Sequence, residues 1–275
     1  MGLADTYSSR AATHDTGTRT AYLVIDTESV PDGRLLSAVK YAGTNLTPEA
    51  AVERARDESR EFSRDGSDFL PVSFQVPVGV CVLRAGPDFA LQGFSCLDAP
   101  QFHPREIVRT FWNGVACHKA KLVTFNGRGF DMPLLELAAF RYGLSAREYY
   151  QNSRNRFNGP IDLMDWLSNF GACKMTGGLN LLAKLLGKPG KMDVSGAQVY
   201  ELYRAGKLQE INDYCLCDTL DTYFVFLRTR ILTGDINLEQ EAELVAKAKE
   251  LLATKTAEFP VLRKYLANWT DFASM

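Results

Sequence analysis

The chain has 275 residues, of which 46% are hydrophobic and 23% charged, and its formal net charge is −2. This hydrophobic content is ample for one buried core and excludes global disorder. Because the net charge is close to zero, the protein as a whole does not attract phosphate. Any nucleic-acid binding must therefore depend on a local basic patch or on bound metal ions.

The six cysteines are scattered without a Cys-x-x-Cys pair, which argues against a zinc site and against a disulfide framework. The sequence contains neither a signal peptide nor an apolar run of membrane-spanning length. We therefore expect a cytoplasmic protein with reduced thiols and no membrane partner.

The N-terminal part of the chain predicts a tail, a strand and a charged helix. Residues 1–20 are polar and lack hydrophobic periodicity, which predicts a flexible tail. The apolar run 21–26 predicts a buried central strand that ends in acid. The stretch 47–64 predicts a surface helix with Thr47 as N-cap and Pro48 in the first turn. Its dense mixture of Glu and Arg favours a solvated, charged insertion.

The rest of the chain alternates between strands and helices before helices dominate. Two strands, 73–83 and 89–96, flank a Gly-Pro-Asp break typical of an antiparallel hairpin. Further along the chain the patterns predict a helix at about 104–116, a buried strand at 121–125, and helices at about 134–142, 179–186, 197–204, 208–232 and 238–253. No linker or repeat divides the chain, so we predict one α/β domain over 21–275 with a C-terminal helical extension.

The first strand ends in two acids on one face. Asp26 and Glu28 are separated by one residue, so both side chains point the same way while the strand remains extended. Two neighbouring carboxylates raise each other's pKa unless a cation lies between them. A polar strand end that faces water is the commoner explanation for an isolated Asp-x-Glu.

Two further acidic points follow later elements. Asp131 comes after a glycine-bearing turn at the carboxyl end of the strand 121–125, where sites of open α/β sheets form. Because Pro133 follows it, helix N-capping explains Asp131 as well. Tyr214 and Asp218 are four apart in a helical pattern and share a face. A half-buried tyrosine hydrogen-bonded within its own helix is an equal explanation for that pair.

In this order, three runs resemble the motifs of DEDD-type exonucleases: Val24-Ile25-Asp26-Thr27-Glu28, residues 125–135 and residues 214–218. The tyrosine branch fits best, since a tyrosine stands four before the last aspartate. The middle run, FNGRGFDMPLL, is similar to the proofreading domain of family B DNA polymerases and to predicted free-standing relatives. The resemblance covers roughly 21–232. It implies an RNase H-like fold, a mixed central β-sheet flanked by helices, and 3′-to-5′ exonuclease activity in a protein too short to include a polymerase domain.

The resemblance also implies catalysis with two divalent cations, Mg²⁺ or Mn²⁺. Under this hypothesis Asp26 bridges both ions, Glu28 and Asp218 hold one of them, and Asp131 holds the other through water. Tyr214, with Glu28, would orient the attacking water, because a phenol with a pKa near 10 is a poor general base at neutral pH.

Candidate substrate contacts lie in two places. Asn126, Arg128 and Phe130 stand beside the middle acidic motif, and Asn126 is favoured because the resemblance includes it. A lysine-rich stretch that contains Lys188 and Lys191 could form a phosphate-binding strip. The bland alternatives are a core role for Phe130 and a solvated helix face for the lysines.

The predicted partner is the single-stranded 3′ end of a nucleic acid, with DNA favoured. An exoribonuclease is the nearest alternative, since a metal site attacks the phosphodiester without reading the sugar. A non-catalytic nucleic-acid-binding module on the same fold is another. A nucleotidyltransferase is less favoured, because no glycine-rich phosphate cradle accompanies an acidic pair. Asp162 and Asp165 are interpreted as helix caps, with support of metal ligands as a lesser possibility.

Overall fold

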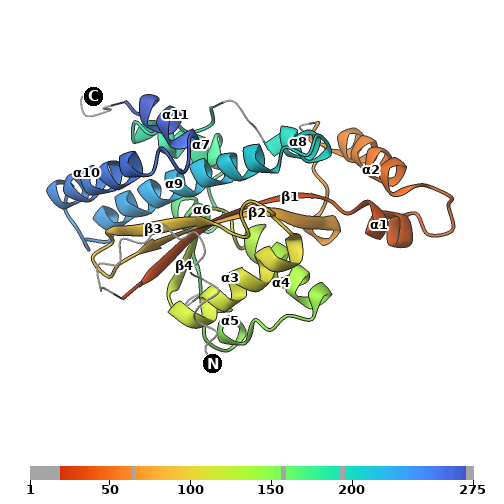
Figure 1. Cartoon of the computed structure of the whole chain (residues 1–275), viewed down its shortest axis with the longest axis horizontal. Helices are drawn as coiled ribbons and strands as arrows, with labels where there is room; N and C mark the ends of the chain where they lie inside the picture. The colour runs from red at the N-terminus through yellow and green to blue at the C-terminus, as the bar shows by residue number, and fades with distance from the viewer. Residues whose placement is uncertain (1–18, 64–65, 156–158, 193–195, 271–275) are drawn as a thin grey trace.

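The computed structural model describes residues 19–63, 66–155, 159–192 and 196–270. Figure 1 shows a central sheet with helices on both faces. Its order is β3-β2-β1-β4-β5, with β1 (Tyr22–Pro31), β2 (Gln75–Ala85), β3 (Leu91–Cys96), β4 (Lys121–Thr124) and β5 (Ile161–Asp162). β2 pairs antiparallel with β1 and β3, while β1, β4 and β5 are parallel. The predicted α/β class, a mixed central sheet flanked by helices, is confirmed.

β1 is the central strand that the apolar run predicts. Leu23, Val24 and Ile25 are at most 1% exposed, because helices cover both faces of the sheet. The strand continues beyond the predicted end to Pro31, since its whole length pairs with β2. The predicted β2–β3 hairpin is confirmed by antiparallel pairing across the turn.

One long helix, α9 (Leu208–Leu232), covers one face of the sheet. It packs on β1 and β2, and outside it lie α7 (Gly178–Leu185), α10 (Leu238–Thr254) and α11 (Val261–Ala267). The other face carries α3 (Pro104–His118), α4 (Asp131–Tyr142) and α5 (Arg147–Asn152). Because α9 is buried nearly all round, its acids are held in a fixed relation to β1.

Several short elements carry no periodic signal and were not predicted. They are α1 (Gly33–Leu35), the π-helix η2 (Leu36–Lys40), α5, β5 and α11. The 3-10 helices η3 (Val72–Phe74) and η4 (Gly196–Gln198) overlap a predicted strand and a predicted helix, and α6 (Leu163–Leu167) follows the predicted cap Asp162. Each spans at most seven residues, which is too short for a hydrophobic period to be read.

The charged insertion forms the predicted helix, α2 (Pro48–Phe62), and Thr47 caps it by accepting a hydrogen bond from the Ala50 N–H at 3.2 Å. Much of α2 is exposed, as expected of a surface insertion, but Ala51, Val52, Ala55 and Arg56 are buried. One side of the helix forms a second small core with residues from before and after it: Leu36, Tyr41, Ala51, Val52, Ala55 and Leu70. Arg56, only 9% exposed, also binds Glu201 of α8 (Val199–Arg204) at 3.1 Å. The insertion therefore packs against its neighbouring segments and is joined to α8 by an ion pair.

Within the described residues, no helix combines the length and apolarity needed to cross a membrane. The predicted N-terminal tail, residues 1–20, falls almost entirely outside the part of the chain that the structure describes.

Candidate active site

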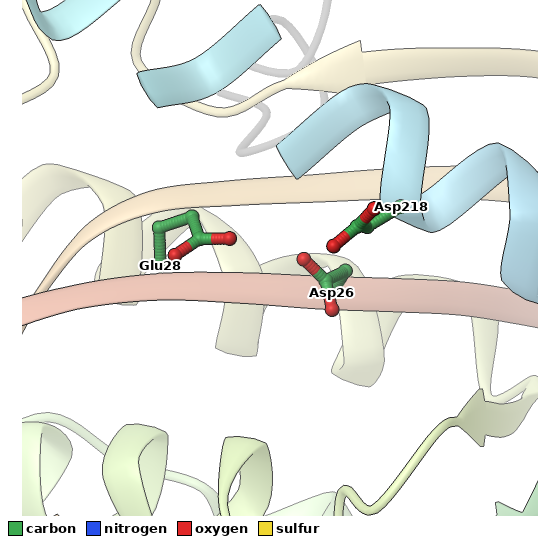
Figure 2. A group of neighbouring side chains, drawn as sticks. All are labelled: Asp26, Glu28 and Asp218. Carbon is green, nitrogen blue, oxygen red and sulfur yellow. The ribbon is translucent and has the colours of Figure 1, made fainter. Parts of the chain in front are cut away.

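Three carboxylates from distant parts of the chain meet between β1 and α9. Asp26 and Glu28 point from the same face of β1 toward Asp218 on α9, as Figure 2 shows. One oxygen from each carboxylate lies within 4.8 Å of the other two, a spacing that suits a shared metal ion. All three side chains are partly buried. The strand alternation thus provides the first two ligands, and the packing of α9 on β1 provides the third.

A bulge and a glycine shape the sheet beside these acids. The pairing register of β1 with β2 shifts between Glu28 and Ser29, as expected of a bulge next to a functional site. Gly79 pairs with Glu28 across the strands. A Cβ at Gly79 would lie 3.2 Å from Asn212 Oδ1 on α9 and 3.4 Å from Glu28 Cβ. The glycine therefore allows the close approach of the helix to the strand.

The fourth acid, Asp131, stands slightly apart from the three. Its Oδ1 accepts a hydrogen bond from Thr27 Oγ1 at 2.7 Å, and only 2% of the residue is exposed. The capping interpretation is wrong, because Phe130 holds the N-cap position of α4 and no side chain caps that helix. Thr27 lies between the two acids of β1, so it connects Asp131 to the strand that carries them.

All four acids line one cavity of about 840 Å³, a volume within the range of roughly 300–1,000 Å³ that is usual for ligand sites. Tyr214 lines it too, as do three of the predicted substrate contacts, Asn126, Phe130 and Lys191. One wall comes from the segment after α2, with Phe69 to Val72, and another from the start of α7, with Gly177 to Asn180.

The crowding of acids raises their pKa values in the absence of cations. Burial first, and then Cys215 and the other acids, raises the pKa of Asp26 well above its ordinary value. Burial, Asp218 and Asp131 do the same for Glu28, while Lys191 opposes them. The negative charge of each carboxylate is therefore unfavourable unless a proton or a cation is bound to it.

Burial also raises the pKa values of the other two acids of the cavity. Burial raises the pKa of Asp131 to about 7 although the hydrogen bond from Thr27 lowers it, and burial raises the pKa of Asp218 to about 6 although Tyr214 and Lys191 lower it. Near neutral pH a divalent cation would therefore compete with a proton at Asp131, and less so at Asp218. Hard carboxylate oxygens on several sides of one cavity fit Mg²⁺ or Mn²⁺.

Tyr214 is positioned one helical turn before Asp218 and close to the acid cluster. Burial, followed by the charges of Asp218 and Glu28, raises the pKa of its phenol, so the hydroxyl keeps its proton over the whole physiological range. A neutral phenol can donate a hydrogen bond but cannot act as a base there. The geometry agrees with an orienting task rather than with proton removal.

Two of the predicted substrate contacts are not brought to the cavity. The guanidinium of Arg128 binds the carboxylate of Asp165, outside the acid cavity. Lys188 is only 7% exposed, and its Nζ lies 3.9 Å from the centre of the Trp269 ring. The lysine-rich stretch is therefore not a continuous strip, because the ring of a residue 81 positions later covers one of its members.

Asp162 braces the turn that leads to Asp131. Its carboxylate caps α6 by accepting from the Met164 and Asp165 N–H groups, which confirms the capping prediction. The same carboxylate also accepts from the N–H groups of Asn126 and Arg128, each at 2.9 Å. Asn126 has a φ of 63°, a left-handed conformation that asparagine tolerates. Asp162 therefore fixes the backbone beside the cavity.

Sequence reasoning missed three residues at the cavity: Thr27, Phe69 and Asn180. Thr27 had a signal, since it stands inside the Asp-x-Glu run, but its bond to Asp131 spans 104 positions. Phe69 contacts Phe130 edge to face, with ring centres 5.5 Å apart, and is 53% exposed. Phe69 and Asn180 lie in segments with no chemical motif, so only the fold identifies them.

Comparison with known proteins identifies a family. Residues 67–269 match a family described as a predicted 3′-to-5′ exonuclease related to the exonuclease domain of PolB. This match includes Asp131, Tyr214 and Asp218 but begins after Asp26 and Glu28. No curated protein matches the chain.

Among solved structures, the chain is similar to the family B DNA polymerase of the hyperthermophilic archaeon Pyrobaculum calidifontis, with 15% identity and a TM-score of 0.48. The similarity covers 87% of this chain but only 29% of that polymerase. Because the family match extends over well more than half of the 275 residues, the chain belongs to the family of predicted 3′-to-5′ exonucleases related to the exonuclease domain of PolB.

Proposed function

We propose that this protein is a metal-dependent 3′-to-5′ exonuclease of the DEDD type with tyrosine, which removes nucleotides from single-stranded DNA ends. The observation that carries the proposal is the meeting of Asp26, Glu28 and Asp218 on a cavity that Asp131 also lines. Buried acids at such spacing repel one another and gain stability from a cation. A phosphodiester is a substrate that divalent cations are suited to activate.

Asp26, Glu28 and Asp218 would hold one divalent cation, and Asp26 with Asp131 would hold a second. When bound, Mg²⁺ or Mn²⁺ supplies a water of lowered pKa and stabilises charge on the leaving oxygen. Thr27 keeps Asp131 turned toward β1 through its hydrogen bond. Tyr214 orients the attacking water together with Glu28, since its phenol remains protonated.

The remaining cavity residues would bind the terminal nucleotides. Lys191 would contact a phosphate, since it is exposed beside the acids and its charge lowers the pKa of Glu28 and Asp218. Phe130 and Phe69 offer ring faces for base stacking, which tolerates any sequence and favours single strands. Asn126 has a polar side chain at the rim of the cavity and would bind the terminal sugar or base.

DNA is the favoured polymer because the family is described by its relation to the exonuclease domain of PolB. Recognition of the 2′-hydroxyl would require a separate polar contact to the sugar. The first assay therefore compares DNA with RNA as substrates.

The assay uses oligonucleotides of single-stranded DNA, duplex DNA and RNA that carry a label at the 5′ end. With Mg²⁺ or Mn²⁺, we expect a ladder of products shortened one nucleotide at a time on single-stranded DNA, and no products in chelator. Asp26→Asn should lower the rate at least about a thousandfold, since it removes a charge that the cations require.

Asp88→Asn is the matched control, because Asp88 is an exposed aspartate in the β2–β3 hairpin. Equal degradation by wild type and Asp26→Asn would refute the site. A ladder on RNA alone would replace DNA with RNA as the substrate. Tight binding of oligonucleotides without products in any metal would favour a non-catalytic module.

A further inference from the structure

The loop of residues 187–191, which follows α7, carries Lys191 to the acid cavity. The Lys191 side chain is exposed and lines this cavity beside Asp218. Two glycines, Gly187 and Gly190, have φ values of 67° and 59°, so the loop turns sharply twice within four residues. Glycine adopts these φ values without strain, but it also loses more conformational entropy on folding than other residues. Its shape therefore has to be imposed by contacts from elsewhere.

The α7 side of the loop provides one anchor. The Lys191 N–H donates to Asn180 Oδ1 at 2.9 Å, and Asn180 itself lines the cavity. A Cβ at Gly190 would lie only 2.4 Å from the same Asn180 oxygen, so a side chain there would break this contact.

The C-terminal end of the described chain provides two more anchors. The Thr270 N–H donates to the Gly187 carbonyl at 2.8 Å, and its Oγ1 reaches the same oxygen at 3.3 Å. The Trp269 ring covers the Lys188 ammonium at 3.9 Å, and Phe224 of α9 lies on another side at 4.9 Å. A desolvated lysine between two rings is a stabilising cation–π arrangement. This end of the chain thus holds two consecutive residues of the loop.

A buried pair on α9 and α11 connects the same region to the active site. The Tyr265 hydroxyl donates to Asp221 Oδ1 at 2.7 Å, and both residues are fully buried. Asp221 lies one turn after Asp218 on α9, and burial raises its pKa to about 7 although the Tyr265 hydroxyl and the backbone of Gly190 lower it. Among the described residues, no side chain donates to its second carboxylate oxygen. Loss of the tyrosine hydroxyl would therefore leave a buried carboxylate without any side-chain donor.

We propose, on the basis of the function proposed above, that the C-terminal segment 261–270 is a positioning element of the active site. It holds the loop 187–191 in place so that the Lys191 ammonium faces the phosphate of the substrate. Tyr265 and Trp269 are positioning residues that act through Lys191 and touch no substrate. Sequence reasoning assigned Lys188 to phosphate binding, but its cation–π contact with Trp269 instead holds the loop in place.

The test combines a double-mutant cycle with hydrogen exchange. Tyr265→Phe should lower kcat/KM for single-stranded DNA about tenfold, but should change it less than about twofold when Lys191 is already alanine. Exchange of the amides in 187–191 should accelerate about tenfold in Tyr265→Phe. Trp269→Leu should reproduce both effects. This second variant provides the test if Tyr265→Phe does not fold.

Tyr223→Phe is the matched control. Tyr223 is equally buried, but its hydroxyl donates to the Phe89 carbonyl at 2.9 Å, in the turn between β2 and β3, and not toward the loop 187–191. It should lower the melting temperature without changing exchange in the loop or the dependence on Lys191.

Unchanged exchange in 187–191 in both variants would overturn the proposal. So would equal losses of activity with and without Lys191, because the tyrosine would then act by another route. Hydrogen exchange needs no substrate. An inactive wild type with the expected exchange would therefore refute the proposed nuclease function and leave the anchoring of the loop in place.

Discussion

Replacing Asp218 by asparagine should make the metal-free protein more stable, although the residue belongs to the candidate active site. Burial raises the pKa of Asp218 from 3.8 to about 6, with Tyr214 and Lys191 lowering it in part. A carboxyl whose folded pKa lies above the unfolded value holds its proton more tightly in the folded state. Its contribution to stability is complete below about pH 4 and is lost as the pH rises through about 6. Asparagine keeps the shape of the neutral carboxyl and avoids this loss.

The magnitude follows from the shift. About two pKa units correspond to roughly 3 kcal/mol once both states are ionised, above about pH 7. Because Asp218 is partly exposed, we expect a gain of about 2 kcal/mol for Asp218→Asn at pH ~8. Near pH ~4.5 the gain should fall below about 1 kcal/mol, since the folded carboxyl then keeps its proton and the pH lies less than about one unit above the unfolded pKa.

The assay is urea unfolding of wild type and Asp218→Asn in chelator at these two pH values, with Asp88→Asn as a control that should show no pH-dependent difference. A variant less stable than wild type at the higher pH would refute the reasoning, because it would mean that the acids do not destabilise the metal-free fold. A gain of the same size at both pH values would contradict it as well, since the destabilisation that burial causes must grow as the pH rises toward about 6.

Mn²⁺ at about a hundredfold excess over its dissociation constant should stabilise the wild type by roughly 2.7 kcal/mol. The melting temperature of Asp26→Asn should not respond, and an equal rise in both proteins would place the ion elsewhere. Burial raises the pKa of Asp131 to about 7, so calorimetry should show weaker Mn²⁺ binding below about pH 7 and release of protons on binding. An Mn²⁺ affinity that does not depend on pH would count against these ligands. Thr27→Val removes the donor to Asp131. It should lower kcat about tenfold, and unchanged kcat would show that the orientation of Asp131 does not matter.

The framework of the site could be predicted because its parts carry local signals. The apolar runs 21–26 and 121–125 lead into the first two motifs, and α9 shows a helical pattern through Tyr214 and Asp218. The order of three weak motifs, read together, indicated the family that the match over residues 67–269 shows. Local pattern was enough here because each motif is fixed by its own strand or helix.

Apart from short elements, the sequence could not show contacts between residues far apart in the chain. Lys188 had the composition of a phosphate-binding residue, but Trp269 covers it. Asp131 had the position of a helix cap, but the hydroxyl of Thr27 binds it instead. α2 had the charge of a solvated helix, but its other side packs into a small core with η2. No periodicity within a segment indicates which distant side chain will meet it.

Anomalous diffraction from crystals soaked in Mn²⁺ tests the central claim most directly, namely that acids from β1 and α9 together bind a catalytic cation. We expect an anomalous peak within about 2.5 Å of oxygens from Asp26, Glu28 and Asp218, and no such peak in crystals of Asp26→Asn. A wild-type crystal with this cavity open to solvent and no peak among the three carboxylates would contradict the account.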